Sequence, residues 1–382
     1  MAVYIDIADS VYEWALNQTK YDGNPNAINQ LLLWKNGTKK PTINQLEKIS
    51  NTLGLPFGYF FLDEPPKEEN PLIEFRTIDS IELDVPSRNL INTIHEMQNI
   101  QAWVAEYHIT EEIGKNNLVG IIKPQGNYLS LTEHIRKELE LPIDWYKSSK
   151  AADDSFRFFK QLLSSFGIIV MMNGIVNNNT RKKLNINEFR AFALINDYAP
   201  LIFINSNDSA NAKLFSLLHE FVHICLGENS LYNDNNAFSQ SKRKTETICN
   251  AIAAEILVPQ EIFTKVWDEN NNKELKEKVI ELTKYFKCSS VVIARKALDN
   301  GFISNSQYEE LASIAKNNYI KKKTNGHPNY YTNTLSKIDN RFLLLLNSSI
   351  AEGKTTFTEA YRLTNTNRNT FDKLITKLEE RL

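Results

Sequence analysis

The sequence of 382 residues lacks the features that mark several large classes of protein. It holds only three cysteines, an odd number and too few for a disulfide framework, as is typical of a reducing compartment. No apolar run approaches the roughly 18 residues that a membrane helix needs, and the early Asp6 and Asp9 argue against a secretory signal. We therefore expect a cytoplasmic protein with no membrane partner.

A large excess of one charge is also missing. The 44 Lys and Arg residues oppose 46 Asp and Glu residues, which argues against a protein that coats nucleic acid along its whole length. The charge is nevertheless uneven: residues 1–66 have five basic and seven acidic residues, and residues 321–382 have eleven basic and six acidic residues. Any contact with DNA through charge is therefore expected from 321–382 rather than from 1–66.

The length predicts two or three domains rather than a single core. Near the N-terminus, Thr42 is a good N-cap for a helix that Gly54 would end. No second helix is evident between Trp14 and Trp34. Residues 67–87 follow Pro65-Pro66 and begin with the run Lys67-Glu68-Glu69-Asn70-Pro71, and we interpret them as a linker.

Periodicity and turn residues predict a mostly helical fold with a small sheet, which is an α+β fold class. The predicted strands are 166–172, 189–195 and 201–204. The predicted helices beyond the linker are 88–107, 131–139, 151–166, 210–226, 244–257, 273–286, 289–300, 356–363 and 369–382.

The sharpest chemical signal is the run His219-Glu220-Phe221-Val222-His223. Side chains at positions i and i+4 share one face of a helix. His219 and His223 can therefore bind one Zn²⁺ together, while Glu220 beside them serves as general base toward a water molecule. The competing interpretation is a buried helix with two structural histidines.

A catalytic zinc site needs a third protein ligand. Metzincins supply a histidine six residues after the second one, but here Asn229 stands at that position. The remaining candidate is a glutamate on the next helix, where Glu246 and Glu255 face opposite sides at about 100° per residue. Only one of them can point at the metal, and we choose Glu246. Glu228, in the loop between the helices, ranks lower.

These residues resemble the core of the ImmA/IrrE family of zinc metallopeptidases. The resemblance rests on the run 215–223, followed by Glu246, Asn250, Ala253 and the segment 257–259. Cys249 and Ile252 stand where the family usually has Ala and Phe, and both are tolerable core changes.

The resemblance implies a zincin-like (gluzincin) peptidase domain over residues 88–320. It also implies that His219, His223 and Glu246 are the zinc ligands and that Glu220 is the catalytic glutamate. In that fold a strand edge beside the zinc holds an extended peptide through main-chain hydrogen bonds. The sequence does not reveal which strand forms that edge.

Helical modules are expected on both sides of the peptidase domain. The run 34–46, with Trp34, Gly37 and Pro41-Thr42, is similar to an Xre-type helix-turn-helix, which implies such a module over 1–66. This module lacks a run of Arg or Lys for base edges, so a docking role competes with DNA binding. The tail, 321–382, resembles a second helix-turn-helix extension, and its alternative is a helical cap that packs on the peptidase.

The resemblance implies a regulatory metallo-endopeptidase that cleaves a specific protein, such as a DNA-binding repressor or a genomically linked partner. The alternative is a transcriptional regulator or antitoxin of a toxin–antitoxin pair. Such a protein would bind DNA and a toxin, and its zinc site would be structural or idle. The intact Glu220 favours the peptidase.

Overall fold

The computed structural model describes residues 3–19, 24–65, 86–227, 240–319 and 330–380. Two compact units divide the chain. The first contains Met1–Leu72, Ile81–Met97 and Ile175–Leu184, and the second contains Ile73–Ser80, Gln98–Gly174 and Asn185–Leu382. The predicted linker, 67–87, lies outside the described residues except for its last two. Each unit is described by itself.

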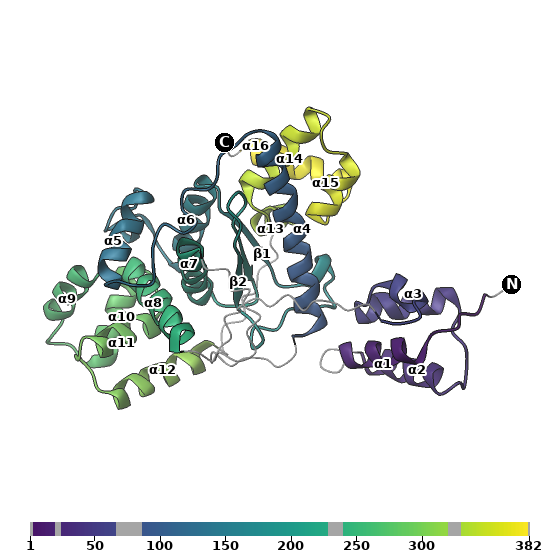
Figure 1. Cartoon of the computed structure of the whole chain (residues 1–382). Coiled ribbons are helices and arrows are strands. Elements are labelled where there is room, and N and C mark those ends of the chain that lie inside the picture. The colour runs from purple at the N-terminus through teal and green to yellow at the C-terminus, as the bar shows by residue number, and fades with distance from the viewer. Residues whose placement is uncertain (1–2, 20–23, 66–85, 228–239, 320–329, 381–382) are drawn as a thin grey trace. The chain divides into compact units, whose positions relative to one another are not determined.

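The N-terminal segment of the first unit contains three short helices and a 3₁₀ turn. They are α1 (Asp9–Gln18), α2 (Pro25–Lys35), α3 (Ile43–Leu53) and η1 (Phe57–Phe61) (Figure 1). Thr42 and Gln45 form a capping box at the start of α3, and Gly54 ends it with φ 74°. Both ends of α3 were predicted, and both are confirmed.

Helix α2 was not predicted, and that expectation is wrong. Asn24 is its N-cap, with a side chain that accepts hydrogen bonds from the N–H groups of Asn26 and Ala27, and Pro25 occupies the first helical position. An Asn-Pro pair is therefore a start signal here rather than a loop, because proline loses no helical hydrogen bond at this position. Leu31 and Trp34 then bury the inner face of the helix.

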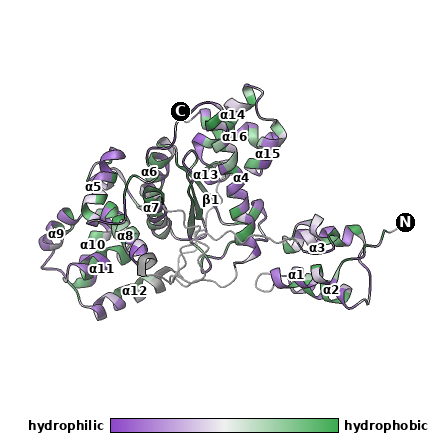
Figure 2. Ribbon diagram, in the orientation of Figure 1, coloured by the Kyte–Doolittle hydropathy of each residue, from purple (hydrophilic) through white to green (hydrophobic). Residues whose placement is uncertain are grey.

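A three-stranded sheet lies at the centre of the second unit. Its order is β1 (Ile169–Asn173), β3 (Leu201–Asn205) and β2 (Ala191–Leu194). β1 runs parallel to β3, and β2 runs antiparallel to it. All three strands were predicted close to these bounds. They are hydrophobic along most of their length (Figure 2), and nearly every strand residue is buried, because helices cover both faces of the sheet.

Helices α6 and α7 cover one face of the sheet (Figure 1), where Phe159 and Phe221 join Val170 and Ile202 in the main core. On the other face, Gln101 of α4 donates hydrogen bonds to the carbonyl oxygens of Leu194 and Ala199.

The helices between the first three and the C-terminal group are α4 (Arg88–Thr110), α5 (Tyr128–Glu138), η2 (Trp145–Ser148), α6 (Ala152–Ser165), η3 (Val176–Asn178), α7 (Ala210–Leu226), α8 (Gln240–Leu257), α9 (Gln260–Glu269), α10 (Leu275–Phe286), α11 (Ser290–Asp299) and α12 (Asn305–Tyr319). Among the described residues, no helix combines the length and the apolar character that crossing a membrane requires.

The C-terminal helices belong to the same compact unit as the sheet. They are α13 (Tyr330–Lys337), α14 (Asn340–Ala351), α15 (Phe357–Thr364) and α16 (Arg368–Glu379). The buried Asp339 joins them to it: its carboxylate accepts hydrogen bonds from Phe342 N–H at the start of α14, Ser164 Oγ of α6 and Val170 N–H of β1. Burial raises the pKa of Asp339, and Lys160 and these donors partly oppose that rise.

Replacing Asp339 with Ala is expected to destabilise the chain by about 2–4 kcal/mol, because an N-cap is lost and a buried N–H group is left unpaired. Asp339→Asn is the matched control, since its single side-chain oxygen still caps α14. Urea unfolding of the three proteins tests this, with a smaller loss expected for Asn than for Ala. Equal stability of all three would show that Asp339 does not hold the C-terminal helices in place.

Candidate metal centre

Helix α7 carries the two histidines. It runs from Ala210 to Leu226, as predicted, with Ser209 as its N-cap and Gly227 as its left-handed C-cap residue. His219 and His223 are one turn apart, and their rings meet edge to face. Both side chains are almost fully buried, so the helix directs them into the protein rather than to solvent.

Helix α8 brings Glu246 to both histidines. Its carboxylate oxygens lie 3.2 Å from His219 Nε2 and 3.1 Å from His223 Nε2, and the two Nε2 atoms are 3.2 Å apart. These three residues are a group that could hold a metal ion. They are the same three residues that the sequence predicted.

The spacing of these donor atoms fits zinc. Bonds of about 2.0–2.1 Å to a tetrahedral zinc ion separate neighbouring ligand atoms by about 3.3–3.4 Å. The observed separations of 3.1–3.2 Å are shorter by only a few tenths of an ångström. Two imidazoles and one carboxylate also leave a fourth position open, as catalytic rather than structural zinc sites do.

Glu220 lies beside the group in a protected position. Its residue surface is 3% exposed, whereas the Glu246 side chain is 43% exposed. The group is therefore closed on the side of α7 and opens to solvent beside Glu246. Glu220 also lies close enough to His223 to raise the pKa of that histidine.

The pKa values of His223 and Glu246 are shifted by the neighbouring groups and by each other. Burial disfavours the charged form of His223, but Cys249, Glu246 and Glu220 outweigh it and raise the pKa of His223 well above its ordinary value. Burial also acts to raise the pKa of Glu246, but hydrogen bonds from both histidines hold that pKa well below its usual range. Metal binding would have to displace the proton that this pair favours.

Glu255 lies elsewhere, as its position on α8 predicted. It is buried and forms an ion pair with Lys296 of α11. Its Oε1 accepts a hydrogen bond from Gln260 N–H at the start of α9, and Arg136 donates to the Glu255 and Ile256 carbonyl oxygens at the end of α8. Glu255 therefore joins three helices. Glu228 lies outside the described residues.

The sequence analysis treated Cys249 only as a core residue, and it is indeed buried. In the structure the thiol lies close enough to His223 for the two groups to interact, and that interaction partly opposes the rise that burial causes in the pKa of Cys249. The signal was visible in the sequence, because Cys249 lies three residues after Glu246 and so shares its helix face.

The end of α7 is packed tightly against the segment around Gly120. Gly120 N–H donates to Ile224 O at 3.1 Å, and Ile122 N–H donates to Cys225 O at 3.0 Å. A Cβ atom on Gly227 would lie 2.8 Å from Gly120 Cα, whereas a Cβ atom on Gly120 would lie 3.9 Å from Gly227 Cα, its nearest neighbour. Both glycines have positive φ.

Gly227→Ala and Gly120→Ala therefore form a matched pair. Each substitution places a side chain on a residue in the left-handed conformation, which is expected to lower the free energy of unfolding by about 1–2 kcal/mol. Gly227→Ala adds a backbone clash, for which we expect about 1–3 kcal/mol more. Thermal unfolding of the two variants checks that Gly227→Ala loses more stability than Gly120→Ala. Equal losses would mean that the close approach does not constrain α7.

Two family models match parts of the chain. Residues 164–298 match the IrrE N-terminal-like domain (Peptidase_M78), which spans β1 to most of α11 and includes all four residues of the candidate centre. Residues 338–377 match a domain of unknown function (DUF8813), which begins beside Asp339. No curated protein matches the chain.

Proposed function

We propose that this protein is a zinc-dependent regulatory endopeptidase that cleaves a specific protein, such as a DNA-binding repressor. One observation carries the proposal: the Nε2 atoms of His219 and His223 and the two carboxylate oxygens of Glu246 converge at separations of 3.1–3.2 Å, close to those around a zinc ion, beside the buried Glu220. The match of residues 164–298 to the IrrE N-terminal-like domain supports it, since that model is of a metallopeptidase-like family.

The residues of the centre divide the work between binding and proton transfer. A bound Zn²⁺ ion would supply Lewis acidity toward a peptide carbonyl group and a water molecule. Neutral His219 and His223, with Glu246, would hold the ion. Glu220 would take a proton from the attacking water and return it to the leaving amine. Its burial keeps it away from competing bulk water.

One edge of the sheet suits an extended peptide better than the other. At the β1 edge, Asp339 accepts the hydrogen bond from Val170 N–H, and α13 packs against β1. β2 is the other edge strand, and it packs against α7, which carries the histidines. We therefore assign the substrate-binding edge to β2, where a peptide would add through main-chain hydrogen bonds.

The N-terminal module suits a protein partner better than DNA. Its α2 exposes Leu32 and Leu33, which offer no hydrogen-bonding groups to base edges. The one basic residue of α2, Lys35, pairs with Glu13 at 3.0 Å. We therefore propose that residues 1–66 dock a protein, either the substrate or a regulator.

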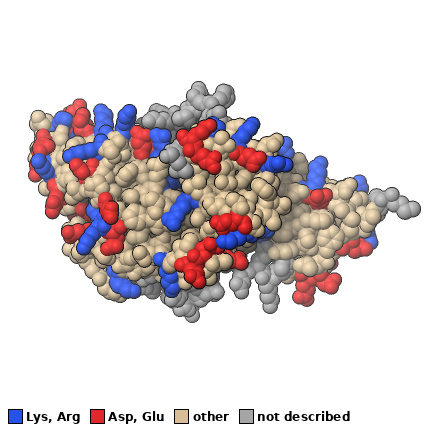
Figure 3. Space-filling view, turned by 90° about the horizontal axis from the view of Figure 1, so that it is seen from above, with Lys and Arg blue, Asp and Glu red and all other residues tan. Residues whose placement is uncertain are grey.

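DNA contact through the tail remains a prediction. The described tail, 330–380, has seven basic and six acidic residues, so most of the positive excess comes from Lys321, Lys322 and Lys323, outside the described residues. Lys354 is also paired, with Glu111 and Glu352. On the face shown in Figure 3, basic and acidic side chains are interspersed rather than segregated.

Co-expression with the neighbouring genes of its genome tests the proposed function. Their products are followed by blot beside the wild-type chain and beside Glu220→Gln. Shortening of one product with the wild type alone supports the endopeptidase. If neither form cuts any product, yet both rescue cells from a neighbouring toxin, the antitoxin function replaces it.

A further inference from the structure

The last two helices of the tail, α15 and α16, are joined by a turn that spans only residues 365–367. Asn365 ends α15 in a left-handed conformation (φ 49°, ψ 43°). Asn367 begins α16 as its N-cap, and its side chain accepts a hydrogen bond from Thr370 N–H at 3.0 Å. α14 packs against both helices. Three helices, with a turn of about three or four residues between the last two, are the arrangement of helix-turn-helix units that bind DNA.

Packing within this group of helices determines which face of α16 meets solvent. The buried face consists of Thr370, Phe371, Leu374, Ile375 and Leu378. Phe371 contacts Tyr361 of α15 edge to face, with 5.7 Å between the ring centroids. The exposed face, up to the last turn, consists of Arg368, Asn369, Asp372, Lys373 and Thr376. Because that face has no apolar side chain, it offers none of the apolar anchors on which most protein interfaces depend.

Positive charge outweighs negative charge on this face of α16. Arg368 and Lys373, and Arg362 of α15, are exposed and form no ion pair with any described residue. Lys373 is held by an uncharged partner, since its Nζ atom lies 3.1 Å from the hydroxyl oxygen of Tyr331. Asp372 is the one carboxylate on the face before the last turn. The exposed side of α16 therefore attracts an anionic partner.

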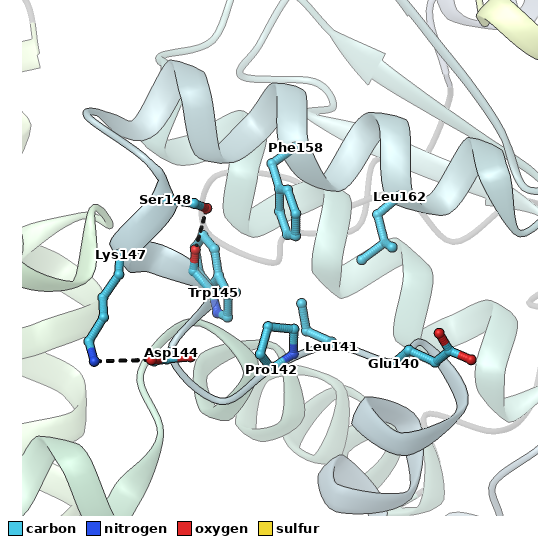
Figure 4. Close-up of a pocket in the computed structure, with 9 residues that line it drawn as sticks. All are labelled: Glu140, Leu141, Pro142, Asp144, Trp145, Lys147, Ser148, Phe158 and Leu162. Atoms are coloured by element: carbon cyan, nitrogen blue, oxygen red, sulfur yellow. Dashed lines mark hydrogen bonds and ion pairs between the residues drawn. The ribbon is translucent and has the colours of Figure 1, made fainter.

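The cavity shown in Figure 4 offers an anionic partner no comparable surface. It lies between α6 and the segment that follows α5, and most of the side chains that line it are apolar. Lys147 is the one basic residue among the described residues that line it, and its Nζ atom pairs with the Asp144 carboxylate at 3.0 Å. The cavity therefore has no unpaired cation for a phosphate group.

We propose that α16 is a recognition helix that enters the major groove of double-stranded DNA and reads base edges through Arg368 and Asn369. These are the first two residues of α16, and the N-terminal residues of a recognition helix make the base contacts. In the major groove, arginine pairs with guanine and asparagine pairs with adenine. Lys373, further along the helix, contacts a phosphate group. The DNA site uses no residue of the metal centre, so it does not rest on the proposed peptidase activity.

Selection from a library of random-sequence DNA duplexes by the full-length chain tests this proposal. One sequence pattern is expected to be enriched, and the chain should bind a duplex with that pattern at least about 100-fold more tightly than an unrelated duplex. An RNA duplex of the same sequence should bind no more tightly than unrelated DNA, because the major groove of A-form RNA is too narrow for side chains to read.

Substitutions on α16 separate base contacts from charge. Arg368→Ala should weaken binding to the selected duplex about tenfold or more. Arg368→Lys keeps the charge but loses the bidentate geometry, so it should reduce the preference for the selected duplex about tenfold and leave binding to unrelated DNA unchanged. Lys373→Ala should weaken binding to both duplexes equally and lower the salt slope by about 1. Fluorescence anisotropy over about 50–200 mM salt measures these affinities.

Arg295→Ala is the matched control. It removes the same charge from an exposed arginine of α11, which lies on the opposite side of this unit from the C-terminal helices (Figure 1). It should leave binding to the selected duplex unchanged. Melting temperatures should stay near that of the wild type in all variants, because the altered side chains are exposed. A library without an enriched sequence, equal binding of the RNA duplex, or wild-type affinity in a folded Arg368→Ala variant would overturn the proposal.

Discussion

Replacement of Glu220 by Gln is expected to reduce cleavage of the protein substrate by about 10²–10⁴-fold, the usual contribution of a general base. Gln has nearly the same size and shape but cannot accept a proton from water at neutral pH. Zinc content should stay at the wild-type level, because Glu220 is not among the three converging donors. Cleavage rates and metal analysis on the same preparations check both parts.

This experiment needs a control measurement that shows that the variant is folded. Glu220 is buried, so a failed variant could reflect misfolding rather than lost chemistry. Circular dichroism and a melting temperature within a few degrees of the wild type exclude that explanation. Cleavage that persists in a folded, zinc-loaded Glu220→Gln protein would refute Glu220 as the base.

Replacement of Glu246 by Ala is expected to lower zinc affinity by more than about 100-fold. Changes in residues that only support a ligand already cost about 10–100-fold, and a direct ligand contributes more. Competition with a chromophoric chelator measures the affinity. The partly exposed side chain of Glu246 makes a large loss of stability unexpected, so zinc loss should occur in a folded protein.

Glu255→Gln is the matched control on the same helix. It keeps the size of the side chain but removes the charge that Lys296 needs in a buried setting, and breaking such a pair costs about 3–5 kcal/mol. We expect lower stability with unchanged zinc affinity. If Glu255→Gln loses zinc while Glu246→Ala retains it, the assignment of the third ligand is wrong.

The elements of the centre were predictable because their signals are local. Helix α7 has an apolar face, a serine N-cap and a terminal glycine, and its bounds match the prediction. The opposite facing of Glu246 and Glu255 follows from helix geometry alone. Helix α2 was missed because Asn24-Pro25 is ambiguous in sequence and serves equally as a turn or as an N-cap followed by a first helical residue.

Features that depend on contacts between distant segments were not predictable. The partner of Glu255 is Lys296, which lies three helices further along the chain. Asp339 meets β1 across more than 160 residues of sequence. His108 is buried, with Nδ1 2.8 Å from the carbonyl oxygen of Tyr198, which lies 90 residues away in the sequence. No periodicity within one helix contains such pairings, so a single sequence does not reveal them.

Hydrolysis of a peptide bond in a specific protein by this centre would leave a new N-terminus on that protein. Labelling of new protein N-termini in cells that express the wild type or Glu220→Gln, followed by mass spectrometry, tests it most directly. New N-termini are expected in one protein or very few, present with the wild type and absent with the variant. Identical sets of N-termini in both cells, with both proteins folded and loaded with zinc, would contradict it.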